Sequence, residues 1–200
     1  MKSRFILMLL AATAMPAVRA AIVYSGVRNI PVPLTIEGEY LRPDTGQSVQ
    51  TMPDDWEGAP WINPFFGGVY IGNSPLLRPV ITGTDQILDL STGTPVDIAS
   101  NFASGESGSS THVGSGPGQF PLGVPGYMGF AFRTAPGGPD YYGWMLMVIN
   151  NTGPGTIVSW AYDDTAGASI KAGDEVPEPR TCAILGTLGL SALLRRRRGA

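Results

Sequence analysis

Cysteine and histidine are almost absent from the 200-residue sequence, which holds only Cys182 and His112. So few of these residues exclude an internal disulfide bond and a zinc site built from cysteine and histidine ligands. Basic side chains are also scarce in the middle of the chain, where residues 21–175 carry 5 of them against 15 acidic ones, a net charge of −10. A nucleic-acid-binding protein needs a basic face to meet phosphate, so nucleic acid is excluded as a partner.

The N-terminal residues have the parts of a secretory signal. A basic start at Lys2 precedes an apolar run over residues 5–14, which is too short to span a bilayer. Small residues then surround a cleavage site. We predict that residues 1–20 form a signal helix, and that signal peptidase cuts between Ala20 and Ala21. The protein is therefore expected to be exported.

The C-terminal residues 176–200 form a second address segment. An apolar stretch over residues 181–194 favours a short helix in lipid, and two prolines before it separate that helix from the domain. These residues cover about 21 Å of a hydrocarbon core of roughly 30 Å, so we expect only a transient anchor in the inner membrane. The motif before the apolar stretch consists of Val176, Pro177, Glu178 and Pro179. The basic run after it, which would stay on the cytoplasmic side, consists of Arg195, Arg196, Arg197 and Arg198.

This order of motif, apolar helix and terminal arginines resembles the PEP-CTERM sorting signal of bacterial envelope proteins. The resemblance implies that a membrane protease–transpeptidase, exosortase, recognises and removes the tail. It also implies delivery to the cell surface or extracellular matrix of a bacterium that makes exopolysaccharide. Cys182 departs from the family, which more often has a small or hydroxylated residue there. The domain is also similar to a recurrent type of PEP-CTERM protein at residues 23–26, 61–68, 141–144, 160–162 and 170–173.

Residues 21–175 have the pattern of a folded all-β domain. Their 24 glycines and 15 prolines approach a disordered composition, but 17 aromatic residues supply a core. No window keeps a 3.6-residue apolar period, whereas short period-2 runs are frequent. Residues 104–119, with five glycines and five serines, are expected to form a flexible loop. We predict a three-stranded meander over residues 126–162 and further strands at residues 22–27, 34–41, 68–71 and 87–90.

The meander predicts how the sheets are layered. Its middle strand, residues 142–149, is apolar on both faces and should be covered on both. This favours a two-sheet β-sandwich of the jelly-roll type over a single open sheet. The outer strands should each turn alternate side chains to one face, namely Met128, Phe130 and Phe132 in the first and Val158, Trp160 and Tyr162 in the third.

No set of residues in the sequence defines a catalytic site. His112 lies in the glycine/serine loop without a Gly-x-Ser-x-Gly elbow, and we expect it to be solvated. A glycosidase needs two carboxylates across a cleft, for which Glu37 with Glu39, or Asp55 with Glu57, would be the candidates. Glu37 and Glu39 should share a strand face at roughly 7 Å. Any acidic β-protein offers such pairs, so we predict no enzyme activity.

Aromatic and acidic side chains are candidates for binding. Exposed rings can stack on sugars, and calcium is bound by carboxylate and carbonyl oxygens. Trp56 is expected to be the most exposed tryptophan, whereas Trp144 and Trp160 should be buried as a cross-strand pair. No EF-hand spacing specifies a calcium site, and no other cofactor is implied. The glycan-stacking candidates are Trp56, Trp61, Tyr141 and Tyr142, and the candidates for a structural calcium ion are Asp54, Asp55, Asp163 and Asp164.

These features lead to one hypothesis and two alternatives. The hypothesis is an exported, non-catalytic protein of the cell envelope or extracellular matrix, with signal peptidase and exosortase as its processing partners. The first alternative is a carbohydrate-binding module for the host exopolysaccharide. The second alternative is a hydrolase that uses one of the carboxylate pairs.

Overall fold

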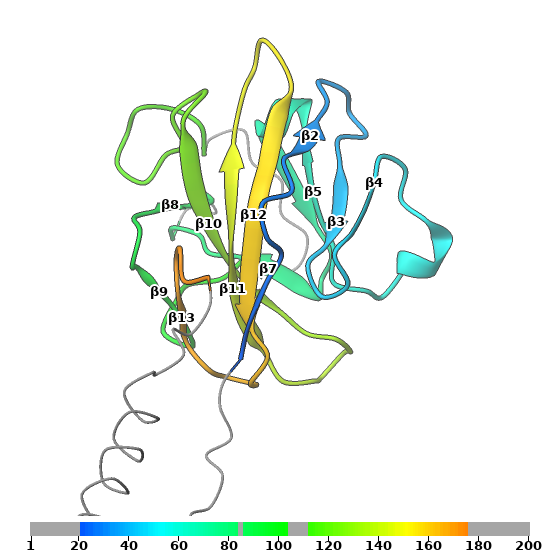
Figure 1. Ribbon diagram of the computed structural model, residues 1–200, viewed down its shortest axis with the longest axis vertical. Coiled ribbons are helices and arrows are strands. Elements are labelled where there is room, and N and C mark those ends of the chain that lie inside the picture. The colour runs from blue at the N-terminus through cyan, green and yellow to red at the C-terminus, as the bar shows by residue number, and fades with distance from the viewer. Residues whose placement is uncertain (1–20, 84–85, 104–111, 176–200) are drawn as a thin grey trace, which may run out of the picture.

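The computed structural model of the chain describes residues 21–83, 86–103 and 112–175 (Figure 1). Ala21, the residue after the predicted signal cut, is thus the first described residue. The predicted signal helix, with Ala20, lies outside the described residues. The sorting tail from Val176 onward, with its predicted helix, also lies outside them, as does the first half of the predicted flexible loop.

The described residues form an all-β structure, which confirms the predicted fold class. They contain thirteen strands and two single-turn 3-10 segments, and this part of the chain has no α-helix. The strands form a seven-stranded, a four-stranded and a two-stranded sheet, in which neighbouring strands are antiparallel. Figure 1 shows the long strands of the seven-stranded sheet between the two smaller sheets.

The seven-stranded sheet is built around the predicted meander, which is confirmed. Its three long strands are β10 (Pro125–Phe132), β11 (Tyr141–Val148) and β12 (Gly155–Asp163). Phe132 lies opposite Tyr141 where the β10–β11 hairpin turns. Short strands extend both edges, since β1 (Ile22–Tyr24) and β2 (Ile30–Val32) pair with β12, and β7 (Leu77–Pro79) and β8 (Asp89–Leu90) pair with β10.

Side chains alternate as predicted in β10 but not in β12. The pairing of β12 with β11 shifts by one residue at Val158, which has no partner in the ladder and forms a β-bulge. Ile157 is therefore buried in the same cluster as Trp160, and the partly buried Tyr162 packs against this cluster. Val158 is only half-buried. The predicted alternation is wrong at Val158 because a period-2 pattern does not include the extra residue of a bulge.

The four-stranded sheet packs on one face of the seven-stranded sheet. Leu41, Ile62 and Ile71 from the smaller sheet share one buried cluster with Met145 and Trp160 from the larger one. Apolar side chains of both sheets thus exclude water between the layers, and this burial is the main stabilising contribution. The strands of the smaller sheet are, in spatial order, β4 (Gln47–Val49), β3 (Tyr40–Arg42), β5 (Ile62–Phe65) and β6 (Tyr70–Asn73).

The two-stranded sheet covers the other face, and its strands are β9 (Pro95–Val96) and β13 (Ile170–Lys171). Val96 and Ile170 lie in a second buried cluster with Tyr142 and Trp144 of β11. The middle strand of the meander is therefore covered on both faces, as its apolar sequence predicted. Trp144 and Trp160 are buried as predicted, but they lie in different clusters, so the predicted tryptophan pair is wrong.

The remaining predicted strands are shorter or shifted. Those predicted at residues 22–27, 68–71 and 87–90 correspond to β1, β6 and β8. The strand predicted at residues 34–41 is wrong over most of its length, because residues 34–37 form bends and only its last two residues enter β3.

The described half of the predicted flexible loop is packed, which corrects the expectation for His112. Its side chain is fully buried, and its ring stands edge-on to the ring of Phe120 at 6.0 Å. The His112 Nε2 atom lies 3.2 Å from the carbonyl oxygen of Gly68, and the Phe120 N–H donates to the His112 carbonyl oxygen at 2.8 Å. Phe120 directly follows the loop, and its burial draws the histidine into the core.

An ion-pair cluster joins β7 to the β10–β11 hairpin. The Asp140 carboxylate accepts hydrogen bonds from Arg78 at 2.5 Å and from Arg133 at 2.7 Å. Partial burial raises the pKa of the Asp140 carboxyl, but the hydrogen bonds and charges of Arg133 and Arg78 outweigh burial and hold that pKa below its usual range.

We expect Asp140→Asn to lower the free energy of unfolding by about 1–2 kcal/mol at pH 7, because two partly exposed ion pairs are lost. A carboxyl whose pKa is lowered by folding stabilises the protein at neutral pH, and this contribution is lost as the pH falls below about 4. Urea unfolding at pH 7 and pH 3 should therefore show a smaller difference between Asp140→Asn and the wild-type chain at pH 3 than at pH 7. An equal difference at both pH values would contradict the role of the charge.

Candidate binding site

A pocket of about 300 Å³ opens at the end of the meander where β10 ends and β11 begins. Side chains from two sheets line it, because the turn between β3 and β4 reaches the ends of β10, β11 and β12. It combines three aromatic rings with two carboxylates and three hydroxyl groups, two of which are phenolic. We call it the Tyr141 pocket. Its lining residues are Asp44, Phe132, Thr134, Tyr141, Tyr162 and Asp164.

Strand register brings the three rings of the Tyr141 pocket together. Phe132 and Tyr141 are direct cross-strand partners, and their rings stack at 5.4 Å between centroids with an angle of 27°. Tyr162 on β12 stands edge-on to Phe132 at 5.1 Å. Phe132 is buried, whereas Tyr141 and Tyr162 are half-buried and reach the pocket. The pocket wall is therefore a preformed aromatic surface.

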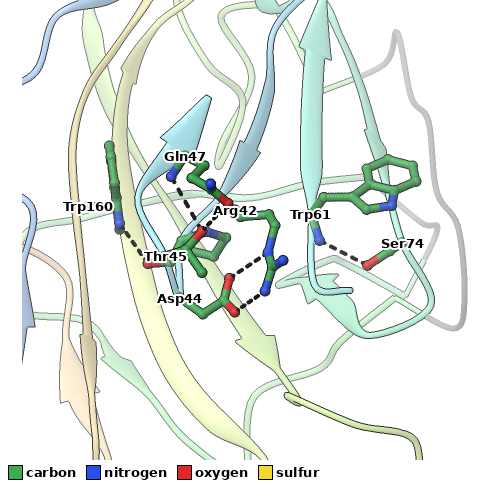
Figure 2. A network of polar contacts seen from close by, with 8 residues as sticks. Arg42, Asp44, Thr45, Gln47, Trp61, Ser74 and Trp160 are labelled. Atoms are coloured by element: carbon green, nitrogen blue, oxygen red, sulfur yellow. Dashed lines mark hydrogen bonds and ion pairs between the residues drawn. The ribbon is translucent and has the colours of Figure 1, made fainter. Parts of the chain in front are cut away.

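The turn that carries Asp44 is held by two contacts on opposite sides (Figure 2). The Arg42 guanidinium donates to both Asp44 carboxylate oxygens, at 3.2 and 2.6 Å. The Trp160 indole N–H donates to the carbonyl oxygen of Pro43 at 3.1 Å, from within the core. Asp44 is thus fixed in position, and the arginine beside it balances its charge.

The Tyr162 hydroxyl group is a hydrogen-bond donor at neutral pH. Burial raises the pKa of the Tyr162 phenol, and the negative charges of Asp44 and Asp164 raise it further, with a smaller effect from Tyr141. The phenol therefore stays protonated. A pocket with aromatic rings, hydroxyl donors and carboxylate acceptors fits a neutral, polyhydroxylated ligand.

The four predicted glycan-stacking residues do not form one exposed face. Trp56 and Tyr142 are each only 3 % exposed, so the prediction that Trp56 is the most exposed tryptophan is wrong. The Trp56 ring lies beneath the Arg42 guanidinium at 5.8 Å. Trp61 is half-buried and stands edge-on to Tyr40, and Figure 2 shows its ring directed away from the Arg42 turn. Of the four, only Tyr141 lines the Tyr141 pocket.

The predicted calcium residues lie on two separate elements. Asp54 and Asp55 begin the 3-10 turn η1 (Asp54–Trp56), whereas Asp163 ends β12 and Asp164 follows it. The Asp163 carboxylate is buried and accepts the Thr165 N–H at 2.8 Å. Within the described part of the chain, no three acidic, cysteine or histidine side chains come together as a metal site.

The Glu37–Glu39 pair considered for a hydrolase is separated by the backbone. Gly38 has a left-handed conformation with φ +59° between Glu37 and Glu39, so these side chains do not share a strand face as predicted. Glu37 is exposed, whereas Glu39 is buried and its carboxyl pKa is raised by burial, an effect that a hydrogen bond with Ser48 opposes. Asp55 and Glu57 are exposed on and beside η1. None of these four residues lines the Tyr141 pocket.

A smaller pocket of about 220 Å³ lies beside β8 and the start of β10. Its one carboxylate, Asp89, accepts the Tyr127 N–H at 3.0 Å. Burial raises the pKa of the Asp89 carboxyl, and the Tyr127 hydrogen bond opposes that effect. This pocket has a single half-buried ring, from Tyr127, and therefore offers a sugar less stacking surface than the Tyr141 pocket.

An exposed apolar surface lies at the 3-10 turn η2 (Phe66–Gly68). Phe66 has an unusual φ of +50° for a non-glycine residue, and the Tyr70 ring stacks on Phe65 at 5.3 Å. The pattern of the sequence did not single this surface out, because its apolar members come from separate turns. We call it the Phe66 surface, and its exposed members are Leu34, Ile36, Phe66 and Tyr70.

No helix within the described ranges is long and apolar enough to cross a membrane. Comparison of the chain with protein-family models, curated proteins and solved structures found no match.

Proposed function

We propose that the chain is an exported, non-catalytic protein of the bacterial envelope or extracellular matrix, sorted through its C-terminal tail by exosortase. The observation that carries this proposal is the pair of address segments, residues 1–20 and 176–200, around a domain with a net charge of −10. We further propose that the two larger sheets are the layers of the predicted jelly-roll-like sandwich. The strong acidic charge of this domain would keep it soluble after export.

Intact mass of the mature protein tests this proposal. In a bacterium that has exosortase, the full chain should yield a product that begins at Ala21 and lacks Arg195 to Arg198. A Glu178→Ala variant should keep its tail and stay in the membrane fraction, while its signal is still removed. A wild-type product that still ends at Ala200 would contradict the sorting proposal.

The Tyr141 pocket supports a second candidate function, the binding of a neutral glycan. Its stacked Phe132–Tyr141 wall offers an apolar platform, and the Tyr162 phenol and Asp44 carboxylate supply a donor and an acceptor beside it. Sugars bind to proteins through such a combination of ring stacking and edge hydrogen bonds. The proposed ligand class is the extracellular polysaccharide of the producing bacterium.

We expect Tyr141→Ala to weaken binding of that polysaccharide by about 2- to 12-fold, since one stacking ring contributes roughly 0.5–1.5 kcal/mol. Tyr70→Ala is the matched control, because Tyr70 is an aromatic residue of the Phe66 surface outside the pocket. Retention of the processed protein on immobilised polysaccharide, with circular dichroism to verify folding, gives the comparison. A calcium chelator added to a parallel sample tests the calcium prediction. Equal retention of both variants and the wild type would contradict binding in the pocket.

A further inference from the structure

The predicted signal-cleavage site lies beside a carboxylate from the other end of the domain. The Ala21 N–H donates to the Asp164 Oδ1 atom at 3.0 Å, although 143 residues separate the two in the sequence. The Asp164 N–H in turn donates to the Ala21 carbonyl oxygen at 3.0 Å. Two reciprocal hydrogen bonds therefore hold Ala21 against the end of β12.

The sheet fixes this contact in place. Ile22, the next residue, is the cross-strand partner of Asp163, so the register of β1 on β12 places Ala21 beside Asp164. Both residues are exposed, and the Thr165 hydroxyl lies 3.5 Å from the same Asp164 oxygen. The chain end that signal cleavage creates at Ala21 would therefore already have a partner.

We propose that Asp164 is the binding site for the α-ammonium group that signal cleavage creates on Ala21. This inference rests on the proposed export function. Hydrolysis of the Ala20–Ala21 bond adds the hydroxyl of water to the Ala20 carbonyl carbon and a proton to the Ala21 nitrogen. The amine then takes a second proton from solvent at neutral pH. The nitrogen that donates to Asp164 as an amide before cleavage thus donates as a cation afterwards, and a charge-assisted pair is stronger.

The pair has a consequence for the Tyr141 pocket, because Asp164 lines that pocket. With Arg42 on Asp44 and the new ammonium on Asp164, both pocket carboxylates carry a cationic partner. Cleavage of the signal therefore removes unbalanced negative charge from the pocket rim. The processed protein should therefore accept a weakly anionic sugar better than the precursor does, because less negative charge at the rim repels it.

The reactivity of the Ala21 amine tests the inference, and the chain provides an internal reference. Lys2 is lost with the signal, so the processed chain has two amines, the Ala21 α-amine and the Lys171 side chain. The full chain is expressed with its own signal, and the processed protein is labelled with limiting acetic anhydride near pH 7. Peptide mass spectrometry then gives the ratio of label on Ala21 to label on Lys171.

We expect Asp164→Asn to raise this labelling ratio about 2- to 5-fold, because an exposed ion pair that holds the amine protonated is lost. Glu37→Gln, at an exposed carboxylate in the bend before β3, is the matched control and should leave the ratio unchanged. In a Lys171→Arg background, Asp164→Asn and acetylation of Ala21 should each lower the midpoint of thermal unfolding by about 1–4 °C. Their combination should lower it no further, since each change removes the same pair.

Two outcomes would overturn the inference, and they are distinguishable. A processed chain whose first residue is not Ala21 would overturn both the predicted cleavage site and the pairing with Asp164. A chain that does begin at Ala21, with the same labelling ratio in the wild type and Asp164→Asn, would overturn the pairing alone and leave export intact.

Discussion

Replacement of Gly67 by alanine is expected to lower the free energy of unfolding by about 3 kcal/mol. Gly67 lies in η2 with φ +70°, a left-handed conformation that costs an alanine roughly 1 kcal/mol. The larger contribution is steric, since an added Cβ atom would overlap the carbonyl oxygen of Asn150, a backbone atom that cannot turn away. Overpacking of this kind costs about 1–3 kcal/mol.

Contacts on both sides of Gly67 prevent relief of this overlap. Its N–H donates to the Pro33 carbonyl oxygen at 2.9 Å, and its own carbonyl oxygen accepts the Asn150 N–H at 3.0 Å. The turn η2 is thus hydrogen-bonded to the turn between β11 and β12, and Gly155, the first residue of β12, also lies against the Gly67 carbonyl group. A shift of either backbone would break one of these bonds, so we expect a loss of stability rather than a local adjustment.

Gly58→Ala is the matched control for Gly67→Ala. Gly58 also has a positive φ, of +80°, but an added Cβ atom would meet no other atom within 4 Å. Its replacement should cost only the conformational term, about 1 kcal/mol. Urea unfolding of both variants gives the difference, and equal losses would contradict the close approach of η2 to the β11–β12 turn.

The meander could be predicted from the sequence because its determinants are local. Short apolar runs with Gly/Pro-rich turns between them predict three strands, and in the structure the first hairpin brings Phe132 opposite Tyr141. The bulge at Val158 could not be predicted, since the groups that bond to its carbonyl oxygen lie in a segment far away in the sequence. The Val158 carbonyl oxygen accepts the N–H groups of both Arg28 and Asn29, at 2.7 and 3.3 Å, where the chain passes from β1 to β2.

Two side chains with polar neighbours were predicted to be solvated and are buried for tertiary reasons. Trp56 stands between Asp55 and Glu57, which are exposed, yet its own ring is covered by Arg42. His112 follows a polar glycine/serine stretch, yet it is buried against Phe120. Local polarity describes the neighbours of a residue and not the contacts that distant segments bring to it.

The Tyr141 pocket could be predicted only in part, for the same reason. The sequence indicates Tyr141 as an aromatic residue at the start of a strand. It indicates Asp164 as a carboxylate that could bind calcium. Asp44 comes from the turn between β3 and β4 in the other sheet, and no sequence period indicates that this turn meets the meander. The contact that joins them is the hydrogen bond from Trp160 to Pro43, which predicts a measurable coupling between core and pocket.

Replacement of Trp160 by phenylalanine is expected to lower the free energy of unfolding by about 2–3 kcal/mol and to weaken glycan binding as well. The Trp160 ring is 2 % exposed, so a smaller ring leaves a cavity between the sheets. The lost indole N–H also leaves the buried Pro43 carbonyl oxygen without its donor, which costs roughly 1–3 kcal/mol. The turn that carries Asp44 then loses its hydrogen bond to the core and keeps only bonds within the β3–β4 hairpin, such as the Arg42–Asp44 pair, so the acceptor is held less firmly at the pocket.

Trp144→Phe separates these two effects. Trp144 is also buried, at 1 % exposure, and its indole N–H also donates to a carbonyl oxygen, that of Asp174, at 2.8 Å. It lies in the other cluster, away from the β3–β4 turn. Both variants should therefore lose similar stability in urea, whereas only Trp160→Phe should lose retention on the polysaccharide when both are compared at temperatures where each is folded. Equal retention would show that the Trp160–Pro43 hydrogen bond stabilises the fold without positioning Asp44 for a ligand.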